Sequence, residues 1–445
     1  MTSDIWGNPL SHSSSEAARR FEKAVGLMNA YQADPVAEID GLLAEHPDFV
    51  MGHVFRAAAM ALTADKLFEP EMVRSLNAAE RLATQANDRE RGHIAALRAW
   101  CDGDIGRAAE AWGRVAMDYP RDIAAIQFAQ LGDFYLGYSA MLRDRVARVM
   151  PYWSPSVPNY GFLLGIYAFG LEETAEYGRA EQLGREAVSF NRQDAWAAHA
   201  VTHVMEMQGR FAEGTAWLQD TAEGWAPGGL FAFHNWWHLA LFNLEAGNIP
   251  AVLQLFDEKI SAGSFGQALE LVDGSALLWR LSVLGHDVGD RWAGLAEKWL
   301  TRIDDGIYAF NDMHAMMSFV GAGWREAQTD LLRVMDASAV QRGTNGIMTY
   351  EVGLPAAQAM AAFGNGDYVR ASELLLTLQG KANRFGGSHA QRDVFSWTLM
   401  EAAIRSSDRP LADAMIAERL ARKPHSPLNK AWASRTGKMA KPRAA

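Results

Sequence analysis

The chain has 445 residues, about three times the length of a typical domain, and its formal net charge is -11. Hydrophobic residues make up 49% and charged residues 21%, so there is ample apolar material for a large core. The acidic balance argues against a nucleic-acid-binding protein, because such proteins carry a basic footprint. The stretch from Arg422 to Arg443 differs, with seven Lys or Arg, no acid and several prolines. This composition predicts that residues 421–445 form a basic, flexible tail.

Cysteine usage and hydropathy predict the compartment. Cys101 is the only cysteine, so no internal disulfide can form, which fits a reducing environment. The opening segment MTSDIWGNPLSHSSSEAARR lacks the basic and apolar regions of a signal peptide. No run reaches the roughly 18 apolar residues of a membrane span. We therefore expect a cytoplasmic protein with no membrane partner and no nucleic-acid partner.

Helical periodicity begins after an N-terminal segment, residues 1–14. In SEAARRFEKAVGLMNAYQ, Ser15 is the expected N-cap and apolar residues recur at helical spacing. A second helix is expected to start at Asp34-Pro35 and to end near Pro47, because proline suits the first position of a helix and the residues beyond its end. Alanine is abundant, β-branched residues are sparse and no long stretch alternates with period two. We expect no strand.

The predicted helices come in pairs. The clearest pair is RGHIAALRAWCDGDIGRAAEAWGRVAMDYPRD, in which Asp102-Gly103-Asp104 forms the turn and Pro120 ends the second helix. Small residues at the crossing, with aromatic residues around them, are typical of the tetratricopeptide helix hairpin, whose period is about 34 residues. Looser copies are YGFLLGIYAFGLEETAEYGRAEQLGREAVSFN, HNWWHLALFNLEAGNIPAVLQLFDE and LPAAQAMAAFGNGDYVRASELLLTLQG.

One such hairpin cannot bury its own apolar face, so neighbouring hairpins must stack. The sequence therefore predicts an all-α fold, an α-α superhelix of the tetratricopeptide-like solenoid type that curls around a central polar pocket. We expect this repeat domain to span residues 15–420, with a mild break near residues 150–161, where three prolines interrupt the pattern.

Two predicted helices each carry a pair of histidines four residues apart. In HNWWHLALFNLE, His238 lies about 40° and Glu245 about 20° from His234 around the helix axis, and nearly every other direction is apolar. A helix that is apolar nearly all round is buried, so this narrow polar stripe faces the interior. In WAAHAVTHVMEMQG, His199, His203 and Glu206 form a matching stripe.

If corresponding helices lie side by side, these two stripes converge. Imidazoles at this spacing can chelate a divalent metal such as Zn, Fe or Mn, or serve as general acid and base. The zincin motif is excluded, because Ala200 and Asn235 stand where it needs Glu. A buried hydrogen-bonded network that sets helix register is the structural alternative, and Trp236 and Trp237 are then simple core packing.

Three other segments have the composition of site loops. AFNDMHAMMSFVGAG puts Asn311, Asp312 and His314 at a helix start, where the plainer interpretation is an N-cap. VDGSALLWRLSVLG has Asp273 as an expected N-cap and Arg280 within the helix. RFGGSHAQRDVFSW places glycines before a helix N-terminus, which suits an anion, although no P-loop or Rossmann fingerprint is present. No Gly-x-Ser-x-Gly elbow occurs, and nothing indicates a cysteine nucleophile.

The segments AAHAVTHVMEMQGR, HNWWHLALF, FNDMHAMM and GGSHAQRDVF, in that order, resemble the tetratricopeptide repeat protein 38 family, as does DFVMGHVFRAAAMAL near the start. The resemblance covers roughly residues 15–420 and implies an all-helical repeat fold without a settled activity. Its recurrent polar positions correspond to His199, His203, Glu206, His234, Asn235, His238, Asp273, Asn311, Asp312, His314, Ser388, His389, Gln391, Arg392 and Asp393. The resemblance implies a His-Asp pair where this chain has Gln130 and Leu131. If that pair helps to form a site in relatives, this protein lacks part of that site or uses a variant chemistry.

Two functions follow from these observations. The first is a histidine-rich interior pocket that binds a small molecule, with or without catalysis and a divalent metal. The expected acid–base residues are His199, His203, Glu206, His234, His238, His314 and His389, the expected metal ligands are His199, His203, His234 and His238, and the expected binding residues are Asn235, Trp237, Asp273, Asn311, Asp312, Ser388, Gln391, Arg392 and Asp393. The second is a scaffold that holds a protein partner in a concave groove, the usual role of such repeats.

Overall fold

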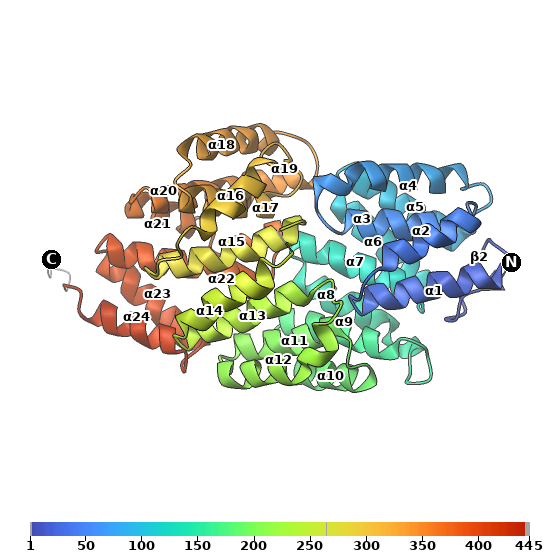
Figure 1. Cartoon of the computed structure of the whole chain (residues 1–445), viewed down its shortest axis with the longest axis horizontal. Helices are drawn as coiled ribbons and strands as arrows, with labels where there is room; N and C mark the ends of the chain where they lie inside the picture. The colour runs from blue at the N-terminus through green and yellow to red at the C-terminus, as the bar shows by residue number, and fades with distance from the viewer. Residues whose placement is uncertain (1, 264, 441–445) are drawn as a thin grey trace. The chain divides into compact units, whose positions relative to one another are not determined.

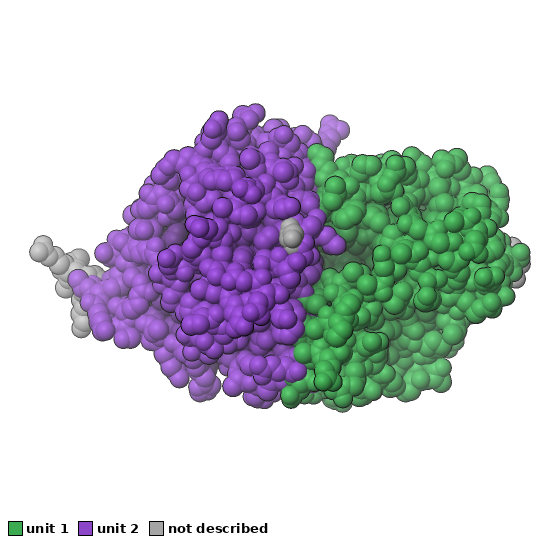
Figure 2. Space-filling model, viewed as in Figure 1, with its two compact units in different colours: residues 1–204, 220–232 green, residues 205–219, 233–445 purple. Residues whose placement is uncertain are grey.

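The computed structural model describes residues 2–263 and 265–440. These residues are mostly helical with almost no sheet, which confirms the predicted all-α helical-repeat class (Figure 1). Contacts divide the chain into two compact units, residues 1–204 with 220–232 and residues 205–219 with 233–445 (Figure 2). The mild break expected near residues 150–161 therefore lies inside the first unit.

The first unit contains a short strand pair and a series of helices. These are β1 (Thr2–Ser3), β2 (Pro9–Leu10), α1 (Ser15–Asn29), α2 (Pro35–Glu45), α3 (Val50–Ala61), η1 (Lys66–Phe68), α4 (Glu69–Arg81), α5 (Asp88–Cys101), α6 (Ile105–Asp118), α7 (Ile123–Leu136), α8 (Ser139–Val149), η2 (Met150–Tyr152), α9 (Tyr160–Glu173) and α10 (Tyr177–Phe190). The expectation of no strand was wrong for β1 and β2, which pair antiparallel over two residues each.

Three helices have residues in both units: α11 (Ala195–Met207), α12 (Phe211–Trp225) and α13 (Ala232–Glu245). The second unit continues with α14 (Ile249–Leu255), η3 (Phe256–Ile260), α15 (Ala268–Val283), α16 (Arg291–Leu300), α17 (Ala309–Gly321), α18 (Arg325–Ala339), α19 (Thr344–Met348), η4 (Thr349–Gly353), α20 (Leu354–Gly364), α21 (Tyr368–Leu376), η5 (Ala382–Phe385), α22 (His389–Arg405), α23 (Arg409–Arg422) and α24 (Pro427–Gly437).

Helix boundaries follow side-chain capping. The α1 N-cap is Ser14, whose hydroxyl accepts a hydrogen bond from the Ala17 amide at 3.1 Å, so the prediction of Ser15 was one residue late. Asp34 caps α2 ahead of Pro35, as predicted. A capping side chain satisfies backbone N–H groups that the helix itself leaves without partners.

Small residues let the paired helices approach closely, as the hairpin pattern predicted. At Gly170 in α9, an added Cβ would lie 2.4 Å from the carbonyl oxygen of Leu142 in α8. At Gly132 in α7, a Cβ would lie 3.1 Å from that of Ala109 in α6. These crossings bring backbones together so that the larger apolar side chains on either side can interlock.

Aromatic side chains form much of each core. In the first unit, the ring of Phe128 lies 5.5 Å from Trp112 and 6.4 Å from Phe55, centroid to centroid. In the second unit, Trp397 and Trp432 pack edge to face at 5.5 Å. Trp112 and Trp432 have no exposed surface, so both contribute their full area to apolar burial.

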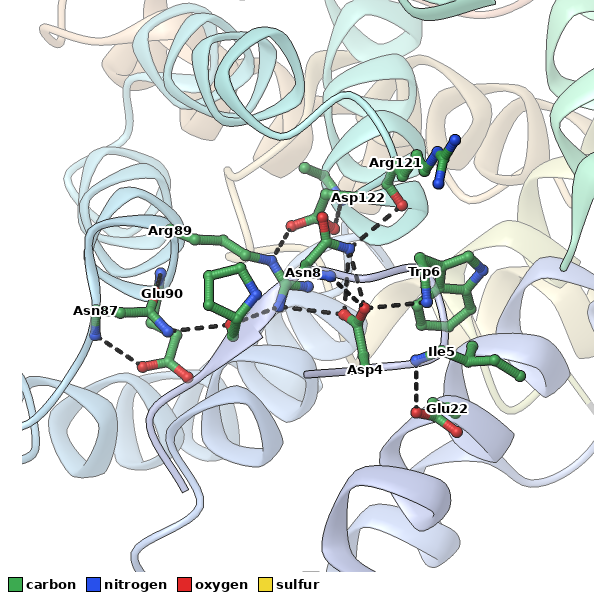
Figure 3. Close-up of polar contacts among 12 residues, drawn as sticks. Asp4, Ile5, Trp6, Asn8, Glu22, Asn87, Arg89, Glu90, Arg121 and Asp122 are labelled. Atoms are coloured by element: carbon green, nitrogen blue, oxygen red, sulfur yellow. Dashed lines mark hydrogen bonds and ion pairs between the residues drawn. The ribbon is translucent and has the colours of Figure 1, made fainter. Parts of the chain in front are cut away.

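A buried ion network ties the N-terminal segment to α5 and α7 (Figure 3). The Arg89 guanidinium lies 2.5 Å from Asp122 and 3.3 Å from Asp4, and His93 lies 2.9 Å from Asp122. Asp4 also accepts from the Asn8 amide at 2.8 Å. Burial raises the pKa of Asp122, but Arg89 and His93 outweigh burial and hold that pKa far below its usual range. The charged groups satisfy one another, which makes their burial tolerable.

The C-terminal stretch differs from its prediction. Residues 427–437 form α24, in which Trp432 is fully buried and donates a hydrogen bond to Glu401 of α22 at 2.7 Å. The expectation of a flexible tail from residue 421 was therefore wrong for this helix, because one aromatic residue supplies enough apolar surface to dock it. The rest of the expected tail, residues 441–445, lies outside the described residues. No described helix is long and apolar enough to cross a bilayer.

Candidate metal centre

The two predicted histidine stripes lie on α11 and α13 and are buried. His199 and His203 of α11 are 2% and 0% exposed, and His234 and His238 of α13 are 4% and 0% exposed. The two rings of each pair are one helical turn apart, with centroids separated by 4.3 Å in α11 and 4.9 Å in α13. Each helix therefore presents two imidazoles on one face.

Three of these histidines place Nδ1 against a buried carboxylate. His234 Nδ1 lies 2.7 Å from Oδ2 of Asp273 in α15, and His238 Nδ1 lies 2.8 Å from Oε2 of Glu206 in α11. His203 Nδ1 lies 3.4 Å from Oε2 of Glu172 in α9. A carboxylate accepts a proton donor, so each contact favours the tautomer with hydrogen on Nδ1 and a lone pair on Nε2.

The ligand atoms gather into groups of the size that holds a metal ion. One nitrogen from each of His199, His203, His234 and His238 lies within 4.8 Å of the others. A second group consists of Glu172, Glu173 and His203. Imidazole nitrogens suit Zn, Fe, Cu and Ni, and carboxylates that contact ligating histidines are the usual outer shell of such sites. The arrangement is therefore a buried histidine cluster that could bind a metal.

Apolar rings surround the cluster. His199 packs against Phe169 at 5.5 Å, Trp196 at 5.1 Å and Phe231 at 5.0 Å, centroid to centroid. Trp237 stacks on His234 at 5.2 Å with an interplanar angle of 12°. Trp237 is thus core packing and a wall of the histidine cluster at once. Such a shell lowers the local dielectric and strengthens each electrostatic contact inside it.

The carboxylates differ in part from the predicted ones. Glu206 contacts a histidine, as its stripe predicted, but Glu245 accepts a hydrogen bond from Ser426 at 2.8 Å instead. Asp273 is not the N-cap of α15, because that helix begins at Ala268 and Gln267 caps it. Asp273 lies within the helix, fully buried, with its pKa raised by burial.

The Asn311 segment is also inside a helix. Tyr308 precedes α17, so neither Asn311 nor Asp312 is the N-cap. Burial raises the pKa of Asp312 to about 7, and burial lowers the pKa of His314 to about 3. His314 Nδ1 lies 2.8 Å from the carbonyl oxygen of Phe310, and His314 is not in either ligand group of the described residues.

The residues from Ser388 to Asp393 cap and anchor the N-terminus of α22. Ser388 and Gln391 form a capping box at the N-terminus of α22, with backbone-to-side-chain distances of 3.3 Å and 2.9 Å. Asp393 pairs with Arg419 at 2.9 Å. Arg392 donates to the carbonyl oxygen of Gly387, and His389 is half-buried outside both ligand groups. The glycine loop therefore ends in a closed cap, not in an open anion site.

Two carboxylates near the histidines, Glu172 and Glu173, were not predicted from the sequence, and the role of Gln130 was not explained. Glu172 and Glu173 end α9, whose other residues from Leu163 to Leu171 are all buried, and acids in such a segment were the available signal. Gln130, at the position where the resemblance implied a histidine, donates to the carbonyl oxygens of Leu142 at 3.2 Å and Ile166 at 2.6 Å. Its role here is to join three helices.

No protein-family model matches this sequence.

Proposed function

We propose that this protein binds a divalent transition-metal ion through His199, His203, His234 and His238, and that the metal centre is its functional site. The contact that carries the proposal is the hydrogen bond from Nδ1 to a carboxylate at His234 and His238, and Nδ1 of His203 lies 3.4 Å from a third carboxylate. This pairing leaves the lone pair on Nε2, which is the atom that then coordinates a metal.

The charge balance supports a cation. Neutral imidazoles contribute no charge to a metal, whereas Glu172, Glu206 and Asp273 place up to three negative charges just behind them. Burying several acids without a cation is costly, since the charged form loses its hydration. A divalent ion at the centre offsets this cost and raises the basicity of the imidazoles through their carboxylates.

A metal held by imidazoles in an apolar shell acts as a Lewis acid or a redox centre toward a small molecule. We therefore infer a small-molecule binder with enzymatic use of the metal, in a protein similar to the tetratricopeptide repeat protein 38 family. The aromatic rings around His199 favour an apolar or aromatic portion in that molecule.

The test is elemental analysis of protein purified without chelators. Wild type is compared with the His199→Ala/His234→Ala variant, which removes one ligand from each helix. The matched control is His93→Gln, because His93 is another fully buried histidine paired with an acid, Asp122, but lies outside both ligand groups. Helical circular dichroism checks that each variant folds.

We expect about one equivalent of metal in wild type and in the His93→Gln control, and a loss of at least tenfold in the double variant. X-ray absorption should show nitrogen ligands at about 2.0–2.1 Å if the metal is zinc. The proposal is wrong if metal-depleted wild type takes up no Zn, Fe, Mn or Cu, or if the double variant binds as much metal as the control.

A further inference from the structure

Arg280 of α15 is a buried cation without a direct acidic partner. It is 1% exposed, and its guanidinium donates to the carbonyl oxygens of Ala276 at 3.1 Å, Ala390 at 2.8 Å and Gln391 at 3.3 Å. None of the carboxylates in the described part of the chain pairs with it. Buried arginine is normally matched by an acid, so this arrangement is unusual.

The acids that act on Arg280 at longer range are already engaged. Asp393 pairs with Arg419, Glu206 contacts His238, and Asp273 contacts His234. Burial lowers the pKa of Arg280 to about 10, which leaves the group charged at neutral pH. The second unit therefore contains a desolvated positive charge whose nearest negative charges belong to other pairs.

Two structural features lie beside Arg280. Its contacts with the carbonyl oxygens of Ala390 and Gln391 place the guanidinium against the first turn of α22. The rings of Trp237 and Trp397 lie 5.4 Å and 5.7 Å from its Cζ atom. The rings hold the guanidinium plane in place.

Polar atoms nearby have no partner among the described residues. Three such atoms are buried: Trp237 Nε1, which is a donor, and Asp273 Oδ1 and His314 Nε2, which are acceptors. His314 Nδ1 is used by the Phe310 carbonyl, so the lone pair is on Nε2, and burial keeps the ring neutral. Phe310 also touches the loop before α22, since a Cβ on Gly387 would lie 2.5 Å from its ring. Buried polar groups in folded proteins are paired by protein, water or ligand.

We propose that Arg280 and Trp237 bind the anionic group of a small oxoanion ligand, and that Asp273 and His314 accept hydrogen bonds from a hydroxyl or amino group of the same molecule. The guanidinium and the indole N–H supply donors, and the two acceptors require a donor on the ligand. The ligand class is a small hydroxy acid or amino acid, or a phosphate ester with a hydroxyl group. This inference goes beyond the proposed metal centre and does not depend on it.

The experiment measures anion binding by full-length, chelator-treated protein, so that no metal can hold the anion. Thermal unfolding is followed against increasing acetate, glycolate or inorganic phosphate, at constant ionic strength made up with chloride. Acetate and phosphate distinguish a carboxylate from a phosphate, and glycolate adds the hydroxyl that the two acceptors need. We expect a saturable rise in Tm with one anion class, with glycolate binding tighter than acetate by threefold or more if the class is carboxylate.

Three variants test which residues cause the anion-dependent rise in Tm. Arg280→Met should abolish it while keeping Tm in anion-free buffer equal to or above that of wild type, because it removes an uncompensated buried charge. Trp237→Phe, which retains a ring but lacks the N–H, should weaken binding several-fold. Trp112→Phe is the matched control, since Trp112 is a fully buried tryptophan of the first unit whose Nε1 also lacks a hydrogen-bond partner among the described residues and whose ring packs against Phe128, and its anion affinity should equal that of wild type.

The outcomes separate a binding site from a structural arginine. A structural Arg280 predicts a much lower Tm for Arg280→Met and no saturable response of wild type to any of the three anions. If Arg280→Met does not fold, Arg280→Lys is used in its place. This variant should lose at least tenfold in anion affinity, since lysine keeps the charge but lacks the planar set of N–H donors of the guanidinium. An unchanged response in Arg280→Lys and Trp237→Phe together would overturn the proposal.

Discussion

Asp273 accepts a hydrogen bond from Nδ1 of His234 over 2.7 Å, although 39 residues separate the two along the chain. The contact joins α13 to α15 inside the second unit, and both side chains are buried. It leaves the lone pair on Nε2, the atom that would coordinate a metal in the proposed centre. Several consequences of this and related contacts can be measured.

Asp273→Asn should lower the affinity for the metal by about 10–100-fold without removing a ligand, because the amide no longer raises the basicity of the imidazole. Competition with a chromophoric chelator measures the change. The matched control is Glu245→Gln, a buried carboxylate on the same helix as His234 that contacts Ser426. Equal losses in both variants would show that Asp273 acts only through overall stability.

Arg89→Met should destabilise the protein by about 3–5 kcal/mol, because it leaves Asp4 and Asp122 buried without their cation. Urea unfolding followed by circular dichroism gives the free energy. Arg114→Ala is the control, since Arg114 forms an exposed pair with Asp118 that contributes well under about 1 kcal/mol. Similar midpoints for the two variants would mean that the network in Figure 3 contributes little.

Asp312→Asn should stabilise the protein increasingly as pH rises from about 4 to about 7. Burial raises the Asp312 pKa to about 7 from its usual 3.8, so in this window the folded state holds a proton that the unfolded state releases. Stability from this carboxyl is therefore present at low pH and lost as pH rises, by up to about 4 kcal/mol. Asparagine does not titrate, so the difference between variant and wild type reports Asp312 alone.

The measurement is the free energy of unfolding in urea at several pH values. Titration of His314 affects both proteins equally and cancels in the difference. Asp330→Asn, an exposed position on α18, reports the general effect of losing one negative charge. A difference for Asp312→Asn that is flat between pH 4 and 8 would contradict the expectation.

Gln130→Met should cost about 1–3 kcal/mol, since it removes the donor shared by the carbonyl oxygens of Leu142 and Ile166 and keeps a similar volume. Thermal and urea unfolding both report it. Metal content should stay at the wild-type level, because Gln130 is outside both ligand groups. A lower metal content would instead place this position in the functional site.

Features that depend on local spacing could be predicted from the sequence. Helical periodicity predicted the hairpins, and the spacing of His199 with His203 and of His234 with His238 predicted two buried polar stripes. An interval of four residues places two side chains on one face of any helix, whatever the helix packs against.

Which acid contacts which imidazole depends on how the helices pack and could not be predicted from spacing. Glu245 has the right angle on α13 but turns to Ser426, whereas Asp273 and Glu172 come from other helices that the pattern did not connect. Asp273 and Asp312, expected near helix starts, lie within helices that begin earlier, at Ala268 and Ala309. Spacing gives a direction around one axis, but partners follow from how helices pack, and packing sums many apolar contacts between residues far apart in the chain.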